Sequence, residues 1–168
     1  MNRYTVAILV KNQFGVLNRL TSMFRRRQFN INSLTASETE SSEYSRITFS
    51  FDGEEENKKQ LINQLYKLPD VCSIKELNDE NSVKCELMMI KMKNSSSTRP
   101  DIYAAAEAFS AETIDYSRDS FVLRLIGQGS KLDDFITLMK DFEILEICRT
   151  GTASLEKGGS VLRQAINL

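Results

Sequence analysis

A short polar loop, Asn12-Gln13-Phe14-Gly15, has the residue types that could most readily bind a small ligand. It lies between an apolar run and an amphipathic one, so Gly15 stands where a helix is predicted to begin. The first N–H groups of a helix lack partners within it and attract carboxylates or phosphates. The Asn12 side chain can donate and accept hydrogen bonds, which suits a free amino acid. Two interpretations stay open from these residues alone: a ligand site, or a turn that Asn12 caps and in which Gly15 lets the backbone bend.

Other candidate motifs have simpler explanations. Gly127-Gln128-Gly129 lacks the third glycine of a dinucleotide fingerprint and the Lys-Ser/Thr of a phosphate loop, so we favour a helix-entry turn. The acidic runs 54–56 and 133–134 fall in the first turns of predicted helices, where carboxylates are ordinary. Arg25, Arg26 and Arg27 end a predicted helix, where cations complement the helix dipole, and we favour this over phosphate binding.

The sequence contains no histidine, which removes the usual general base and the commonest metal ligand. Cys72, Cys85 and Cys148 stand singly, without metal-ligand or redox spacing, and we interpret all three as buried core residues. No nucleophile motif of the Gly-x-Ser-x-Gly kind is present. We therefore expect no catalytic residues and no metal site in this chain.

Composition narrows the class of protein further. Hydrophobic residues make up 41% and charged residues 27%, as in a globular chain that can bury a core. A net charge of −1 does not indicate a nucleic-acid partner. The apolar runs have the length of strands and not of membrane spans, and the N-terminus does not resemble a signal peptide. We expect a cytoplasmic protein without a membrane or nucleic-acid partner.

The pattern of apolar residues predicts the same order of elements twice. In the first half we expect strands over residues 4–10, 31–37, 44–51 and 71–77, with helices after Gly15 and after residue 53. In the second half we expect strands over residues 83–92, 113–116, 121–126 and 143–150, with helices over 99–110 and after Gly129. Each half reads β-α-β-β-α-β, the ferredoxin-like order. We predict an α+β protein with two tandem ferredoxin-like domains, residues 1–77 and 78–168.

Segments in both halves carry a family resemblance. In the first half they are residues 12–19 (NQFGVLNR), 29–35 (FNINSLT) and 45–48 (SRIT). In the second half they are residues 86–91 (ELMMIK), Phe109 with Ile114-Asp115, Gly127 with residues 131–133 (KLD) and Phe135, and residues 146–151 (EICRTG). Together, from Arg3 to about Ser154, they resemble the small subunit of acetolactate synthase (acetohydroxyacid synthase).

This resemblance implies that the first domain is an ACT domain, a sensor of amino acids. It implies a non-catalytic regulatory subunit that binds the catalytic (large) subunit, raises its activity and confers feedback inhibition by branched-chain amino acids, usually valine. Thiamine diphosphate, FAD and Mg²⁺ would belong to the catalytic partner, and this chain would hold no cofactor. A free-standing ACT-type regulator of another partner is the alternative.

In the family, the effector lies between the ACT domains of a homodimer. Carried over to this sequence, Asn12, Gly15 and Val16 of one protomer would hold the amino-acid backbone, while Asn30 and Ile31 would come from the other protomer. Three flanking residues depart from the family pattern. These are Gln28, where glycine is usual, and Asn32 and Lys11, where acidic residues are common.

Overall fold

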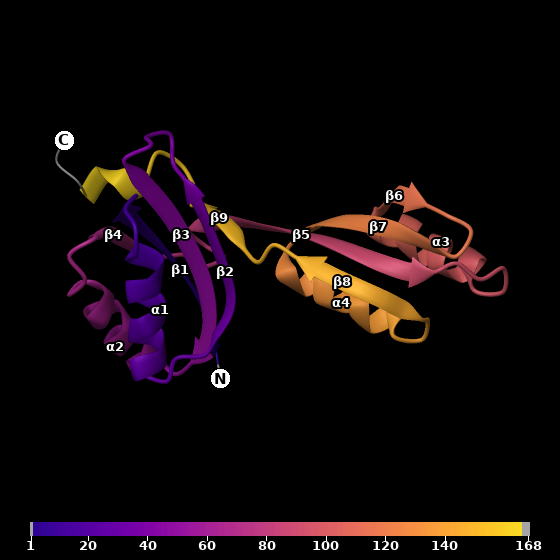
Figure 1. Cartoon of the computed structure of the whole chain (residues 1–168), viewed down its shortest axis with the longest axis horizontal. Coiled ribbons are helices and arrows are strands. Elements are labelled where there is room, and N and C mark those ends of the chain that lie inside the picture. Colours follow the sequence, from indigo (N-terminus) through magenta and orange to yellow (C-terminus); the bar gives the residue numbers. More distant parts are fainter. Residues whose placement is uncertain (1, 166–168) are drawn as a thin grey trace. The chain divides into compact units, whose positions relative to one another are not determined.

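The computed structural model describes residues 2–165 and divides them between two compact units (Figure 1). The first unit comprises residues 1–84 together with 152–168, and the second comprises residues 85–151. The predicted division at residues 77 and 78 differs from this one, because the C-terminal residues fold back onto the first unit. Among the described residues, no helix is long and apolar enough to cross a membrane.

The first unit contains a four-stranded antiparallel sheet in the order β2-β3-β1-β4. Figure 1 shows both of its helices on the same side of this sheet. Its elements are β1 (Asn2–Lys11), α1 (Val16–Arg26), β2 (Ile31–Glu38), β3 (Tyr44–Gly53), α2 (Glu55–Leu65) and β4 (Val71–Glu76). The predicted β-α-β-β-α-β order is therefore confirmed.

Strand β1 is apolar on both faces because both faces of the sheet are covered. Val6 and Ile8 point into the core beneath the helices, opposite Phe49 and Ile47 of β3 in the strand register. The alternate residues Ala7 and Leu9 are also buried, in a second cluster on the other face. That cluster includes Leu77 and, from the C-terminal residues, Leu162.

The C-terminal residues supply this cover through two elements that the sequence did not predict. Strand β9 (Ala153–Glu156) pairs with β5, and the short 3₁₀ helix η1 (Leu162–Ala165) packs on β1 and β4. The Arg46 guanidinium donates a 2.5 Å hydrogen bond to the Ser154 carbonyl oxygen, which holds this segment on the sheet. The tail therefore completes the first unit.

Helix α1 has the spacing of an amphipathic helix and a defined end. Val16, Leu20 and Phe24 recur every four residues and are all buried. The helix ends in a Schellman turn, in which the Phe29 N–H donates to the Phe24 carbonyl at 3.0 Å. Gln28 occupies the left-handed position of that turn with φ of 58°. Glycine adopts such a φ without strain, whereas a glutamine there is strained.

The second unit repeats the architecture with a sheet in the order β6-β7-β5-β8. Its elements are β5 (Ser82–Lys93), which begins in the first unit, α3 (Arg99–Phe109), β6 (Glu112–Tyr116), β7 (Ser120–Gly127), α4 (Gly129–Met139) and β8 (Ile144–Arg149). Met88, Ile90 and Met92 of β5 are buried in one core with residues of both helices. The alternate residues of β5 and β7 are half-buried or, like Met89 and Ile126, exposed, so one face of this sheet is open.

The prediction that all three cysteines are buried is wrong. Cys85 and Cys148 are exposed, and Cys72 is half-buried. Cys85 alternates with the buried residues of β5, and Cys148 is the register partner of Met89 on the open face. The physical reason is that a strand covered on one face only exposes every second residue.

Candidate functional site

The loop between β1 and α1 presents an uncapped helix start to solvent. Gly15 is the N-cap residue of α1 and has φ of 81°, a left-handed conformation that favours glycine. No side chain caps this end, and the first turn of α1 contains no acidic residue. Its N–H groups and the positive end of the helix dipole are thus suited to a carboxylate of a ligand.

Asn12 ties this loop to the turn between β2 and β3. Its side-chain nitrogen donates to Glu38 Oε1 and to the Ser42 carbonyl oxygen, each at 3.0 Å, and its backbone N–H donates to the Glu43 carbonyl at 2.7 Å. Among residues 2–165, no donor is bonded to the side-chain oxygen of Asn12. Asn12 therefore has a structural role and also retains an acceptor that an ammonium group could use.

A cleft of about 110 Å³ opens beside the loop. Most of its lining is aliphatic, and Val16 at its base is buried. The residues that line it are Val10, Lys11, Asn12, Gln13, Val16, Leu17, Ala36, Ser45 and Ile47. Sites for small ligands usually enclose about 300 Å³ or more, so this cleft is smaller than a typical ligand site.

The structure brings together some of the predicted site residues and separates others. Asn12, Gly15 and Val16 lie together at the loop, whereas Asn30 and Ile31 lie at the start of β2. Asn12 contacts Glu38 at the other end of that strand, and seven residues of β-strand span ~23 Å. One copy therefore does not join the two groups, and the site formed by two copies stays a prediction.

Sequence reasoning missed an ion pair below the loop. Arg19 Nε lies 2.6 Å from Asp70 Oδ2, and the Asp70 side chain is largely buried. A Cβ atom on Gly15 would lie 3.3 Å from Arg19 Nη1, so the guanidinium reaches the loop backbone. It adds positive charge near the uncapped helix start. Its position four residues after Gly15 was visible in the sequence, but the pairing with Asp70 across 51 residues was not.

The loop between β7 and α4 in the second unit, which contains Gly127 and Gly129, lies against the protein's own carboxylates. Gly129 begins α4, and a Cβ atom there would lie 2.9 Å from Glu86 Oε1. Arg149 holds Glu86 and Asp133 at 2.5 Å each. The glycine thus makes room for an internal ion-pair network, which supports the predicted helix-entry turn over a phosphate site. Within residues 2–165 there is no cluster of three or more potential metal ligands.

Comparison with protein families assigns both units. Residues 6–73 match the family described as the AHAS small subunit-like ACT domain, so the first unit and its loop define an ACT-domain protein. Residues 85–158 match the family described as the small subunit of acetolactate synthase.

Individual relatives are similar to this chain over nearly its full length. The chain is 40% identical to the acetolactate synthase small subunit of Bacillus subtilis, covering 91% of this chain and 90% of that protein. It is 32% identical to the acetolactate synthase isozyme 3 small subunit of Escherichia coli, covering 96% of this chain and 99% of that protein. The crystal structure of the small subunit from Thermotoga maritima superposes with a TM-score of 0.85 at 30% identity, covering 95% and 100%. The chain belongs to the family of acetolactate synthase small subunits, as the resemblance implied.

Proposed function

We propose that this chain is the regulatory subunit of an acetolactate synthase, which activates the catalytic subunit and makes it sensitive to branched-chain amino acids, valine in particular. The observation that carries the proposal is similarity to small subunits over both units, whereas a free-standing ACT-domain regulator would need to match the first unit only. The protein acts in the cytoplasm as a homodimer.

The chemistry of the reaction belongs to the catalytic subunit in this proposal. The catalytic subunit holds thiamine diphosphate, FAD and Mg²⁺. The present chain has no histidine, and the Glu86 and Asp133 carboxylates beside α4 are engaged by Arg149. It acts through binding, and not through acid–base or nucleophilic catalysis.

The effector binds at the β1–α1 loop, between two copies. Its carboxylate lies at the uncapped start of α1, within the field of Arg19, and its ammonium group donates to the Asn12 side-chain oxygen. The aliphatic lining beside Val16 suits a small branched side chain. Asn30 and Ile31 of a second copy close the cleft, whose volume within one copy is about 110 Å³.

Reconstitution with the catalytic subunit of the same organism tests this function. We expect added small subunit to raise the rate of acetolactate formation, and valine, leucine or isoleucine to lower it. A coupling of about 1–3 kcal/mol between the two sites corresponds to roughly a 5- to 150-fold change in apparent affinity. An unchanged rate with no new sensitivity to these amino acids would exclude the proposal, and a different partner in pull-downs would favour the free-standing regulator.

The loop itself is tested by Gly15→Asp. The added carboxylate repels the effector's carboxylate at the helix start, so inhibition should be lost while activation remains. Gly158→Asp is the matched control, because Gly158 also has positive φ, 72°, and has open space around it. Equal effects of the two substitutions would argue against an effector at this loop.

Sedimentation should also show that valine favours the dimer, as expected of a ligand that binds both copies.

A further inference from the structure

A basic groove lies between α1 and the end of α2, on the face of the first unit that carries both helices. Its volume is about 420 Å³. Four of the nine residues that line it are cationic, and none is acidic. They are Asn18, Arg19, Ser22, Met23, Arg26, Arg27, Gln64, Lys67 and Leu68.

Most of this positive charge is not neutralised within the chain. Arg19 pairs with Asp70, but among residues 2–165 Arg26, Arg27 and Lys67 make no ion pair. The Arg27 guanidinium donates a 3.4 Å hydrogen bond to the uncharged Gln64 Oε1. Helix α1 contains no acidic residue that could pair with them along its surface.

The helix dipoles account for only part of these cations. A helix C-terminus carries the equivalent of about half a negative charge. The ends of α1 and α2 together therefore offset about one of the three unpaired cations in the groove. The remaining positive charge is exposed, so it can attract a negatively charged partner.

The shape of the groove favours a protein segment over a small phosphate. Phosphate sites commonly use the N–H groups at a helix N-terminus, whereas this groove runs along one side of α1, from Asn18 to Arg27, and reaches α2 only at its C-terminal end. Half-buried Met23 and Leu68 provide an apolar floor between the charges. Such a surface suits acidic side chains alternating with apolar ones.

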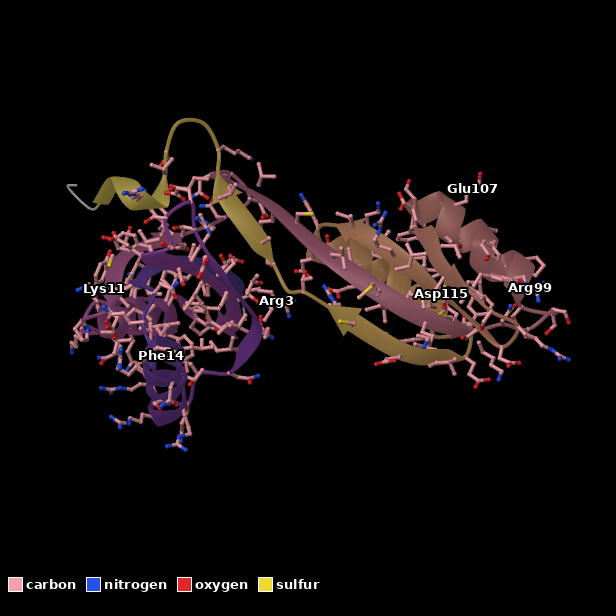
Figure 2. The ribbon with its side chains drawn as sticks, turned by 45° about the horizontal axis from the view of Figure 1, so that its top comes forward. Arg3, Lys11, Phe14, Arg99, Glu107 and Asp115 are labelled. Carbon is pink, nitrogen blue, oxygen red and sulfur yellow. The ribbon has the colours of Figure 1, made fainter. Side chains whose placement is uncertain are left out.

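The groove is continuous with the loop proposed to bind the effector. Arg19 lines the groove and also reaches the backbone at Gly15. Phe14, next to Gly15, is fully exposed and is labelled on the first unit in Figure 2. An exposed aromatic beside a basic surface is characteristic of protein-binding sites, where aromatic and arginine residues carry much of the affinity.

We infer that the groove between α1 and α2, with Phe14 at its edge, is the docking surface for an acidic segment of the acetolactate synthase catalytic subunit. This inference rests on the proposed function and names the surface through which it operates. Effector and partner would meet the same helix, one at its first turn and the other along its exposed side. Arg19 connects the two.

Paired charge-neutralising variants test the groove. Arg26→Gln with Lys67→Gln removes two groove cations, one beside each helix. Arg25→Gln with Lys59→Gln removes the same charge from the same two helices at exposed positions that do not line the groove. Binding of each protein to the catalytic subunit is measured by calorimetry at two salt concentrations, alongside activation and thermal unfolding.

We expect the groove variant to bind roughly tenfold or more weakly than wild type and to lose much of the salt dependence. The control should bind within about twofold of wild type. Activation at saturating subunit should be unchanged, which separates weaker docking from a damaged fold. Equal weakening in both variants, or none in either, would overturn the inference.

Two further results would also overturn it. The groove variant could retain full binding to the catalytic subunit but fail to self-associate, which would make the groove an interface between copies. Inorganic triphosphate could bind the wild-type chain alone and not the groove variant, which would make it a small-anion site. If wild type binds and activates the catalytic subunit and the groove variant binds it as tightly as wild type does, only this inference fails. If wild type neither binds nor activates, the proposed function fails with it.

Discussion

The two sheets have the same strand order but differ in how many of their faces are covered. Strand β1 of the first sheet buries residues on both faces, because helices lie on one side and the C-terminal residues on the other. Strand β5 of the second sheet buries every second residue and exposes the alternate residues, such as Met89. Repeated topology therefore does not imply repeated packing. What distinguishes the units is the segment that returns to cover one of them.

The largest expected effect on stability comes from weakening the contact of the C-terminal residues with the first sheet. Leu162→Ala should lower the free energy of unfolding by about 2–3 kcal/mol, because the leucine is 7% exposed and packs with Ala7, Leu9 and Leu77. Ile126→Ala, on the open face of the second sheet, should cost less than about 1 kcal/mol, since Ile126 is 51% exposed. Urea denaturation of both variants measures the difference. Equal losses would show that the second face of the first sheet needs no cover.

Cysteine labelling measures the same difference in cover between the two sheets. Cys72 packs against the cluster that contains Leu162, and burial raises the pKa of its thiol. A raised pKa keeps the group protonated near neutral pH, so the reactive thiolate is scarce. We expect iodoacetamide to modify Cys85 and Cys148 roughly tenfold faster than Cys72, as followed by peptide mass spectrometry. Leu162→Ala should narrow that gap; an unchanged Cys72 rate in this variant would mean that the tail does not protect it.

The units are alike in one detail, the end of their first helix. Gln28 after α1 and Ser110 after α3 both adopt left-handed φ values, 58° and 56°. Gln28→Gly and Ser110→Gly should each stabilise the protein by about 1 kcal/mol, because glycine adopts this conformation without strain. Thermal unfolding tests both. A stabilisation at one position only would reveal that one of the two side chains makes a compensating contact.

The smallest change in the free energy of unfolding is expected from substitution of Phe14. Its side chain is fully exposed, so Phe14→Ser should change the free energy of unfolding by less than about 0.5 kcal/mol. Chemical denaturation measures this, with Phe49→Ser in the core as a strongly destabilised comparison. A large loss at Phe14 would mean that the ring packs within the chain. A small one would allow its effect on partner binding to be measured without a change in folding.

The sequence predicted local structure better than long-range contacts. The repeated β-α-β-β-α-β order followed from alternating and helical spacing, as at Val16, Leu20 and Phe24, because these patterns depend on near neighbours. Elements β9 and η1 were missed because their apolar residues form no periodic run. Residues 6–10 are apolar on both faces of β1, which is typical of a strand covered on both sides, but no local pattern could identify Leu162 as part of the cover.

For the candidate site too, the sequence indicated the local residues but not their long-range contacts. Asn12 and Gly15 were recognisable from their residue types and from the helix that follows them. The contacts of Asn12 with Glu38 and of Arg19 with Asp70 form only in the folded chain, and no spacing in the sequence predicts them. The basic groove could not be predicted for a related reason. Arg25 and Arg26 do lie in the last turn of α1, as the sequence indicated, but only the folded chain places Arg26 and Arg27 beside Lys67, which follows α2.

The return of the tail has a consequence for how the protein is made. Residues 85–151 are inserted, in terms of the chain, within the first unit. During synthesis, N-terminal domains generally fold first as they leave the ribosome. Here the N-terminal sheet emerges early but receives Leu162 only after the whole second unit has been synthesised. The second unit can therefore finish folding first, and the nascent first unit exposes Ala7 and Leu9 until Leu162 has been added.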